Sequence, residues 1–506
     1  MSGNILDLIE DGADEQAPAG RPRQADQLVR MALERYSFGV SKTGDTYGIA
    51  TDGPRIARLM RGSAASIRAD LAKRYYMDHG RAPSSTSLAD AMAVLQGFAS
   101  CEEPTDLHIR YAAADGVLWI DLGDTTGRVI RVSADGWRIE DETPVLFRRS
   151  ELTGTFMEPV PGGSLDELRD FLNVDDAAWR LVAGWLVSAF FPDIPHPILV
   201  LQGEQGTGKT AAGRILGSLV DPSPAPLRTA PRDVGEWITV ADGAYLVAFD
   251  NLSGLSGWLS DALCRAVTGD GLARRKLYSD GDLVVSSFRR LLLMTGIDFG
   301  ALNADLIDRS LFVELERIAP EARRLDSQIT RDFTSAYPRI LGGLLDLVSA
   351  TMRELPHTTL DTLPRMADHA LVLAALDEAT QDVHLACYEQ AAGRAMAEAA
   401  DGDSVAEAVL LFMATRDTWT GTASELMEFI TPRDVPKRWP PTAHHLSGQM
   451  KRLGPVLRAR GVEVEHIRTH EGRAIVLTSV THDAGDAQIS LSFSEKEERN
   501  GNERQM

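Results

Sequence analysis

The sequence of 506 residues exceeds what one hydrophobic core can fill and predicts about three domains. Apolar residues make up 44% and charged residues 25%, which are the proportions of an ordinary water-soluble chain. A formal net charge of −21 excludes nucleic-acid binding by overall attraction, so any such contact requires a local basic surface.

Cysteine usage and hydropathy exclude further classes of protein. Cys101, Cys264 and Cys387 lie far apart without a CxxC spacing, so neither a disulfide framework nor a structural zinc site is expected. Residues 1–12 lack the pattern of a signal peptide. The apolar run over 181–191 is too short for a bilayer, which takes about 20 residues. We therefore expect a cytoplasmic protein without a membrane partner.

The amino-terminal part of the chain predicts a tail followed by an α+β domain. Residues 1–25 are rich in Gly, Ala, Pro and acids, which is typical of a disordered tail. The domain, residues 26–161, starts with helical and hairpin patterns: a helix from near Ala25, a hairpin over 38–51, and helices over 54–76 and 87–98. It ends in four short strands separated by Asp-Gly-type turns, over 108–112, 117–121, 129–132 and 137–139. No motif in this domain carries chemistry, and its role stays open.

The remaining chain predicts a parallel α/β core, a helical region and a small carboxy-terminal domain. A linker rich in Pro and Gly precedes residues 165–320, where helices over 165–172 and 175–190 lead into alternating strands and helices. Residues 321–400 are mainly helical in pattern. Residues 404–479 predict a winged helix: helices over 404–414, 422–430 and 443–460, then strands over 462–467 and 473–478. Residues 481–506 are polar and without periodicity, as in a second disordered tail.

A glycine-rich loop joins an apolar strand over 198–201 to a helix over 211–219. The loop matches the pattern GxxxxGK[ST] and consists of Gly203, Glu204, Gln205, Gly206, Thr207, Gly208, Lys209 and Thr210. Its backbone N–H groups and the start of the helix would hold phosphate oxygens. Lys209 would reach the β- and γ-phosphates, and the Thr210 hydroxyl would ligate Mg²⁺. The motif predicts ATP and Mg²⁺ as cofactors; the alternative is a glycine-rich turn that happens to precede a helix.

A second apolar strand, over 245–249, ends in Asp250 and Asn251. A carboxylate at a strand end beside a P-loop is how such enzymes hold the magnesium ion, so Asp250 is the predicted Walker B residue. Asn251 can orient water but cannot accept its proton, so fast hydrolysis is in doubt. The alternative for Asp250 is a solvated residue at the end of a buried strand.

Two later residues complete the predicted catalytic set. Thr295 ends a third apolar strand, over 291–294, and is a candidate sensor of the γ-phosphate, although a Thr at a strand end is also ordinary. Arg309 precedes the last strand and suits an arginine finger offered to the ATP of a neighbouring subunit. Its alternative is a local pair with Asp308 or Asp305.

The ordered set of P-loop, Asp at a strand end, polar strand end and late Arg resembles the AAA+ ATPases. Within these it is most similar to superfamily 3 helicases and viral primase-helicases, because Thr268 to Tyr278 resembles their TGGxxxxR segment. A closer likeness is to large ATP-binding proteins of phages and integrative elements, carried by residues 248–253, 258–264 and 305–309. The resemblance covers roughly residues 147–350.

The sequence departs from the helicase pattern in two places. Asn251 stands where many relatives carry a catalytic Glu, and the third strand lacks a clear Asn at its end. No primase motif occurs in the amino-terminal domain, so the resemblance does not imply primer synthesis.

Two basic segments are candidates for DNA contact. In the relatives, the TGGxxxxR segment leads into a hairpin that touches DNA in the central channel of a hexamer; the corresponding residues here are Arg274, Arg275, Lys276 and Tyr278. Pairing of Arg275 with acidic neighbours or with a neighbouring subunit's nucleotide, and a core position for Tyr278, are the alternatives. The winged helix offers Lys451 and Arg452 on its third helix, with Arg458, Arg460, Arg468 and Arg473 nearby. A winged helix that binds protein instead is the alternative.

The sequence thus predicts an α/β P-loop NTPase of AAA+ type with an amino-terminal α+β domain and a carboxy-terminal winged helix. ATP would drive an oligomeric ring, with a hexamer as the form the resemblance implies, on single-stranded or forked DNA in phage or mobile-element replication. Two rivals remain open. One is a nucleotide-gated switch or scaffold with slow hydrolysis, which Asn251 favours, and the other is a DNA-binding regulator whose assembly ATP controls.

Overall fold

The computed structural model describes residues 23–60, 66–269, 272–275, 283–286, 288–297, 302–401, 403–436, 439–469 and 472–480. The chain divides into two compact units. The first comprises residues 1–300 and 309–391, and the second comprises residues 301–308 and 392–506. The tails were predicted over residues 1–25 and 481–506. Residues 1–22 and 481–506 lie outside the described residues, whereas Gln24 and Ala25 belong to the first helix, so the amino-terminal bound was placed too late. Among the described residues no helix is both long enough and apolar enough to cross a bilayer.

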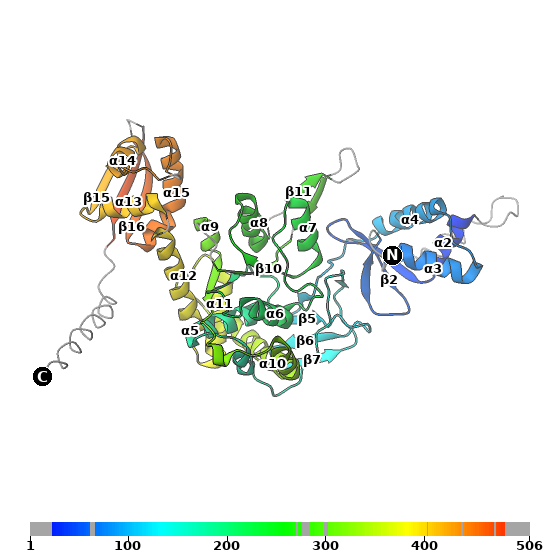
Figure 1. Cartoon of the computed structure of the whole chain (residues 1–506). Coiled ribbons are helices and arrows are strands. Elements are labelled where there is room, and N and C mark those ends of the chain that lie inside the picture. The colour runs from blue at the N-terminus through cyan, green and yellow to red at the C-terminus, as the bar shows by residue number, and fades with distance from the viewer. Residues whose placement is uncertain are drawn as a thin grey trace. The chain divides into compact units, whose positions relative to one another are not determined.

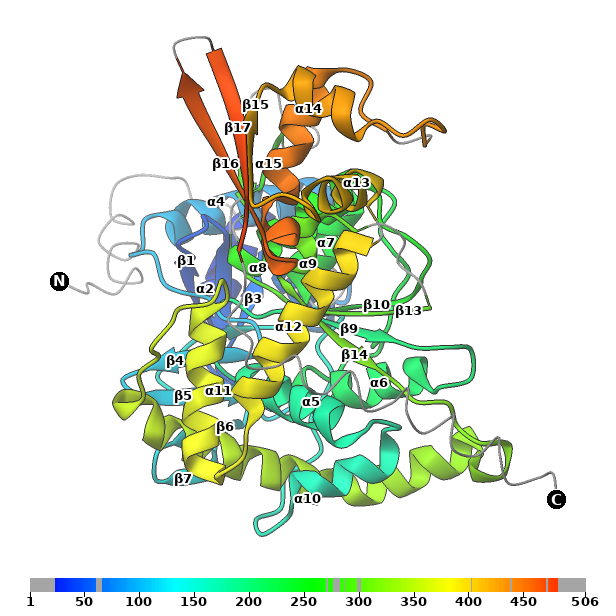
Figure 2. The ribbon, with the colours of Figure 1, turned by 90° about the vertical axis from the view of Figure 1, so that its left-hand side faces the viewer.

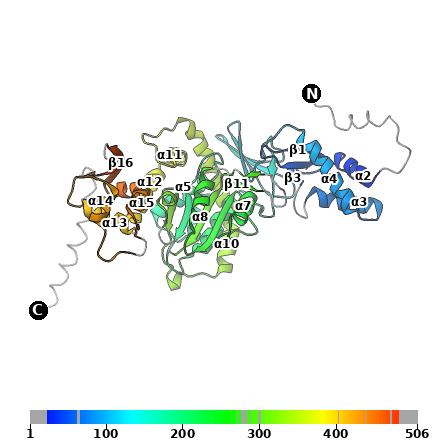
Figure 3. The same cartoon turned by 90° about the horizontal axis from the view of Figure 1, so that it is seen from above.

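The first unit begins with three helices packed on a small sheet, as Figure 3 shows. The helices are α2 (Gln24–Leu33), α3 (Ile67–His79) and α4 (Ser85–Ser100). The sheet has the order β1 (Tyr36–Val40), β2 (Thr46–Ala50), β3 (Ile56–Leu59) and β8 (Phe147–Arg148). Leu28, Ile67, Leu71, Tyr75 and Leu95 lie fully buried between these elements.

The prediction of a helix over 54–76 is wrong in its first part. Residues 56–59 form β3, and the helix α3 starts only at Ile67. Strand β3 pairs with β2, where Leu59 lies opposite Tyr47, and with β8, where Ile56 lies opposite Phe147. Strand β2 is the preceding strand, whereas β8 lies far along the chain. Hydrogen bonding to both strands overrides the local helical pattern.

A four-stranded antiparallel sheet follows, in the order β4-β5-β6-β7. Its strands are β4 (Tyr111–Ala114), β5 (Val117–Asp121), β6 (Val129–Ser133) and β7 (Gly136–Glu140). The β4–β5 turn is an Asp115-Gly116 pair with φ of 53° and 73°, so the hairpin predicted from Asp-Gly is confirmed. The first strand begins at Tyr111 and not at 108, because Arg110 has a φ of 65° that interrupts an extended chain.

The centre of the first unit is a parallel sheet in the order β10-β13-β9-β14. Figure 1 labels β10, and Figure 2 labels all four strands. Its strands are β9 (Ile198–Gln202), β10 (Leu246–Leu252), β13 (Leu291–Gly296) and β14 (Ser310–Glu314). The helices of this region are the 3₁₀ helix η1 (Leu165–Phe171), α5 (Asp176–Ser188), α6 (Lys209–Val220), α7 (Val234–Gly243) and α8 (Gly257–Thr268). All pairings are parallel, so the carboxyl ends of the four strands lie at one edge.

A two-stranded antiparallel ribbon, β11 (Leu272–Arg275) and β12 (Leu283–Ser286), lies between α8 and β13 in the chain. Arg274 and Arg275 are on β11, where only the backbone is described. Lys276 and Tyr278 lie outside the described residues, so the contacts expected of this segment stay predictions.

Two long helical segments complete the first unit. Helix α10 (Asp326–Glu354) has 29 residues and runs from the parallel sheet to the antiparallel one, as Figure 2 shows. Near its end, Trp137 Nε1 donates to Asp346 Oδ1 at 2.8 Å and Ser349 Oγ donates to the Ser133 carbonyl oxygen at 2.6 Å. Helix α11 (Ala367–Thr380) packs on α10 and α5. The short 3₁₀ helices η2 (Pro320–Ala322) and η3 (Leu355–His357) flank α10, and α12 (His384–Asp401) leads into the second unit.

The second unit combines helices with a small antiparallel sheet. Its helices are α9 (Ala304–Ile307), α13 (Ser404–Met413), α14 (Ala423–Ile430) and α15 (Ala443–Ala459). The sheet has the order β15-β17-β16, from β15 (Thr418–Gly421), β17 (Gly472–Ser479) and β16 (Val462–Thr469). The three helices and last two strands agree with the predicted elements, whereas β15 was not predicted. Its four residues form a strand because they pair with β17.

Candidate nucleotide-binding site

The loop between β9 and α6 has the backbone conformation that its glycines permit. Gly203, Gly206 and Gly208 have φ of 146°, 86° and 84°, a region that L-residues with a Cβ rarely adopt. A Cβ at Gly203 would lie 2.7 Å from the carbonyl oxygen of Leu315, so a larger residue would also clash there. The loop can therefore curl tightly at the carboxyl end of β9 and point into the start of α6.

Lys209 lies inside this curve. Its Nζ donates to the carbonyl oxygens of Gly203 and Glu204, both at 2.7 Å. Burial lowers the pKa of the Lys209 ammonium, and the negative charge of Asp250 acts in the opposite direction. Two carbonyl dipoles thus take the place of water around a partly desolvated cation, which is a setting in which an incoming anion binds strongly.

Side chains from three strand and loop ends meet beside Lys209. Thr210 Oγ1 donates to Asp250 at 3.0 Å from Oδ1 and 3.3 Å from Oδ2. Thr295 Oγ1 donates to Asp250 Oδ1 at 2.6 Å. The Thr210 hydroxyl and the Asp250 carboxylate supply the hard oxygen donors that Mg²⁺ prefers, so these residues fit that ion.

Thr295 holds the end of β10 in place as well. Its Oγ1 accepts a hydrogen bond from the backbone N–H of Asn251 at 3.0 Å. Asn251 has a φ of 54°, in the left-handed region that Asn tolerates better than most residues, and the pairing of β10 with β13 shifts at this point. Only 1% of Thr295 is exposed, so its hydroxyl serves Asp250 and Asn251. Of the sequence-predicted catalytic residues, the structure brings together Lys209, Asp250, Asn251 and Thr295, with Thr210.

Arg309 lies at the other edge of the sheet. Its carbonyl oxygen accepts a hydrogen bond from the N–H of Ile198, and the adjacent Ser310 pairs with Ile198. The glycine-rich loop follows the opposite end of β9, about 16 Å away at 3.3 Å per residue. Within one chain, therefore, Arg309 does not join the cluster around Asp250.

One cation near the loop was not found from the sequence. Nη2 of Arg323 lies 3.7 Å from the place that a Cβ on Gly206 would take. Arg323 is exposed and follows η2, on the segment that connects β14 to α10. No motif marks this position, because it approaches the loop only through the path of the chain after β14.

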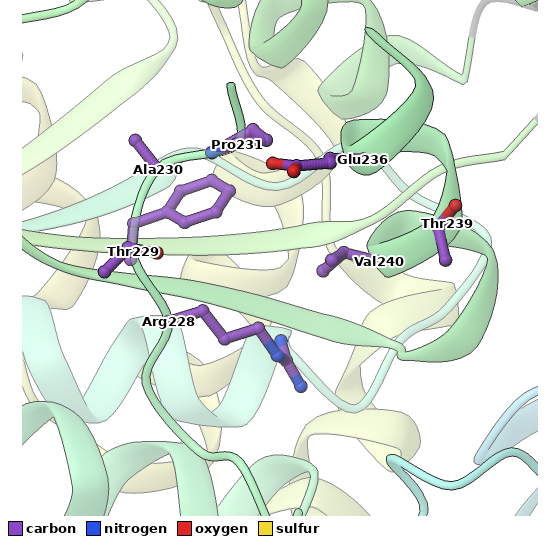
Figure 4. A pocket seen from close by; sticks show the side chains of 8 residues that line it. Arg228, Thr229, Ala230, Pro231, Glu236, Thr239 and Val240 are labelled. Carbon is purple, nitrogen blue, oxygen red and sulfur yellow. The ribbon is translucent and has the colours of Figure 1, made fainter. Parts of the chain in front are cut away.

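Two hollows flank the carboxyl edge of the sheet. The larger, of about 600 Å³, begins at the loop and continues between α6 and α10. The smaller, of about 330 Å³, lies against the outer edge of β10, where Arg228 exchanges backbone hydrogen bonds with Ala248 and Asp250. Figure 4 shows that the guanidinium of Arg228 points away from Glu236, which is paired with Arg232. Of these two hollows among the described residues, the larger is lined by residues of the glycine-rich loop and the smaller is not.

Basic side chains of the second unit lie on α15 and on the β16–β17 hairpin. Lys451 and Arg452 are exposed on α15. Burial and the charge of Lys451 lower the pKa of His466, so Lys451 and β16 are close neighbours. Arg468 lies directly opposite Arg473 across the hairpin.

These hairpin residues share one face with Lys451. Residues opposite each other in an antiparallel pair, and residues two apart on a strand, point to the same face. His466 is opposite the buried Ile475, so Arg468 and Arg473 extend the face that covers the core. Arg458, by contrast, donates two hydrogen bonds of 2.7 Å to Glu463.

The parallel sheet, with its glycine-rich loop at the carboxyl edge, fits the core of an NTPase. Residues 165–396 match the family model of the actinomycete integrative conjugative element replication protein, and residues 405–492 match that of the AICE RepA C-terminal domain. The two matches follow each other in the chain in the order their descriptions imply. The chain is therefore similar to replication proteins of mobile elements over most of its length.

Comparison with solved structures gives remote likenesses. The A-form apo structure of the NrS-1 C-terminal region is 10% identical, with a TM-score of 0.40, over 90% of this chain and 99% of that one. A JCV helicase with a bound small molecule is 11% identical, with a TM-score of 0.24, over 46% of this chain and 70% of that one. No curated protein matches the sequence.

Proposed function

We propose that the chain binds ATP with Mg²⁺ at the β9–α6 loop and acts as an ATP-hydrolysing, helicase-like motor on DNA in mobile-element replication. The observation that carries this is the convergence of Lys209, Thr210 and Asp250 at the carboxyl edge of one parallel sheet. The likeness to integrative-element replication proteins supports a role in mobile-element replication. The glycine-rich loop supports ATP as the substrate, because the geometry of the loop suits a chain of phosphates.

The roles of the residues follow from their contacts. Lys209 Nζ would exchange its hydrogen bonds to the carbonyl oxygens of Gly203 and Glu204 for hydrogen bonds to phosphate oxygens. Thr210 and Asp250 would hold Mg²⁺, which when bound would supply positive charge for phosphoryl transfer. Thr295 fixes the orientation of the Asp250 carboxylate.

Two arginines would act on the phosphates from different sides. Arg323 approaches the loop within its own chain and adds positive charge near Gly206. Arg309, at the opposite edge of the sheet, reaches a nucleotide only in a neighbouring subunit, and this requires a homo-oligomer such as a hexamer. An arginine supplied in trans is worth about 10³–10⁵ in rate in well-studied enzymes.

DNA contact is proposed for the second unit. Helices α13, α14 and α15 and a three-stranded sheet that ends in a long hairpin support the proposal of a winged helix. Lys451, Arg468 and Arg473 would give it a basic face. Arg468 and Arg473 are like charges directly opposite each other in the hairpin, a destabilising arrangement. A phosphate bound between them would reduce this repulsion. In an acidic chain this is the kind of local surface that nucleic acid needs.

A nucleotide-gated switch with slow hydrolysis is the second candidate. Asn251 favours it, because an amide beside the metal carboxylate cannot accept the proton of the attacking water. The Asn251 backbone is in the left-handed region, and its N–H donates a hydrogen bond to Thr295 Oγ1. This backbone conformation fixes the position from which the Asn251 side chain extends.

Three measurements on one preparation separate these functions: the ATPase rate with and without single-stranded DNA, the mass with and without nucleotide, and strand displacement on a forked duplex. A motor gives DNA-stimulated turnover and displacement, whereas a switch gives nucleotide-dependent assembly with neither. Binding of no nucleotide at all would overturn both.

The DNA surface has its own test. Lys451→Ala should reduce the slope of log affinity against log salt by roughly 0.7 for a single strand. The matched control is Arg458→Ala, because that guanidinium already binds Glu463. An equal slope in the Lys451 variant and wild type would remove α15 from the interface.

A further inference from the structure

The lining of the larger hollow extends beyond the residues of the glycine-rich loop. One end is formed by Gly206, Gly208, Lys209 and Thr210. The other end lies between the exposed face of α6 and the first turns of α10, where Ile215, Ile329 and Phe333 contribute apolar surface. A volume of about 600 Å³ is within the range of small-molecule sites.

The apolar end has a fixed shape. The ring of Phe333 makes edge contacts with Phe171, at a centroid distance of 5.4 Å, and with Tyr337, at 5.6 Å. The Tyr337 hydroxyl donates to the carbonyl oxygen of Ser218 at 2.7 Å and so ties α10 to the last turns of α6. Phe333 is therefore held as a wall of the hollow before any ligand arrives.

The polar groups near this wall are mostly occupied. The Ser218 hydroxyl donates to the carbonyl oxygen of Ile215 at 2.7 Å, and that of Thr330 donates to the carbonyl oxygen of Asp326 at 2.8 Å. The ionised side chains that line the hollow here, Arg214 and Asp326, are exposed. A ligand at this wall would therefore be held mainly by apolar contact and only to a small extent by hydrogen bonds.

We propose that this wall, formed by Ile215, Ile329 and Phe333, binds the base of the nucleotide whose triphosphate lies on the glycine-rich loop. The inference rests on the proposed function and adds the base site to it. Continuity of the hollow with Lys209 identifies the occupant, because a nucleotide's base follows its phosphates along the same cavity. Stacking and apolar contact favour the larger purine rings over pyrimidines and discriminate little between adenine and guanine.

The test compares ATP, GTP, CTP and inorganic tripolyphosphate on the full chain by calorimetric titration with Mg²⁺. Wild type should bind ATP and GTP with similar affinity and about tenfold more tightly than CTP or tripolyphosphate, which corresponds to about 1.4 kcal/mol. Phe333→Ala should bind ATP no more tightly than tripolyphosphate while keeping wild-type affinity for tripolyphosphate. Phe333→Leu, which retains apolar volume, should lie between the two and guards against a loss of folding.

Leu325→Ala is the matched control, since this α10-flanking side chain is 65% exposed and does not line the hollow. It should leave all four affinities unchanged. Equal binding of ATP and tripolyphosphate by wild type, or an ATP preference that survives in both Phe333 variants, overturns the base site alone. Failure of wild type to bind any of the four ligands overturns the proposed function together with it.

Discussion

A buried ion pair links the antiparallel sheet to the far end of α6, and its removal has a predictable cost. Arg110 Nε and Asp221 Oδ1 are 2.8 Å apart, with 1% and 4% of the two side chains exposed. Arg110 also donates to the carbonyl oxygens of Asp121, Gly154 and Pro222. The pair is therefore fully desolvated and fully hydrogen-bonded.

The buried carboxylate of Asp221 is stabilised by Arg110 and by two backbone N–H groups. Its Oδ2 accepts from the N–H groups of Tyr245 and Leu246 at 2.9 and 3.0 Å. Arg110→Met keeps most of the side-chain volume but leaves the Asp221 carboxylate buried without its cation. Removing one partner of a buried pair typically costs about 3–5 kcal/mol, and we expect a loss of that size in the free energy of unfolding.

Urea unfolding followed by circular dichroism measures this loss, with Arg138→Met as the control because Arg138 is 66% exposed in its pair with Glu140. The control should change the stability by less than about 1 kcal/mol. The double variant Arg110→Met/Asp221→Asn should be less destabilised than the two single changes added together, because it removes both charges. Additive effects of under about 1 kcal/mol each would refute the reasoning.

Further predictions concern pH, metal dependence and subunit sharing. Burial lowers the pKa of His196 to about 4 and that of His369 to about 3, so both rings are neutral in the folded protein and the unfolded chain binds more protons. The contribution of the two neutral rings to the free energy of unfolding should be fully present above about pH 6.5 and should fall by about 2 kcal/mol per ring by about pH 5. An unfolding midpoint that does not change with pH in this window contradicts this prediction. Thr295→Val should raise the Mg²⁺ concentration for half-maximal ATPase and Thr295→Ser should restore it, whereas equal Mg²⁺ titrations would mean that Thr295 does not position Asp250. Mixing Arg309→Ala with Lys209→Ala subunits should restore part of the activity that each lacks alone, and no recovery after confirmed subunit exchange argues against a shared site.

The parts of the site that the sequence predicted are those with a local signature. Gly203 to Thr210 follow one strand and open one helix, so their conformation is set within a few residues of chain. Asp250 and Thr295 each end a buried apolar run. Because parallel strands share a carboxyl edge, their meeting could be expected before the structure. The contact of Thr295 with Asp250, in contrast, depends on β13 lying between β10 and β9.

What the sequence could not predict depends on partners far along the chain. Strands β3 and β15 have only four residues each, and each pairs with a strand far along the chain, β8 and β17 respectively. Arg323 approaches Gly206 only because the segment after β14 passes the loop. Phe333 is one of many apolar residues on α10, and nothing local separates it from the core positions of that helix. Periodicity predicts an element's type, whereas these contacts require the packing of several elements.

Calorimetric titration of ATP with Mg²⁺ into wild type and Lys209→Ala tests the central claim most directly. Lys73→Ala is the control, since Lys73 is exposed on α3. We predict that wild type and the control bind ATP equally and that Lys209→Ala loses at least about tenfold in affinity, or 1.4 kcal/mol, while unfolding at an unchanged urea concentration. Unchanged ATP affinity in the folded Lys209 variant would contradict the assignment of the β9–α6 loop as the nucleotide site.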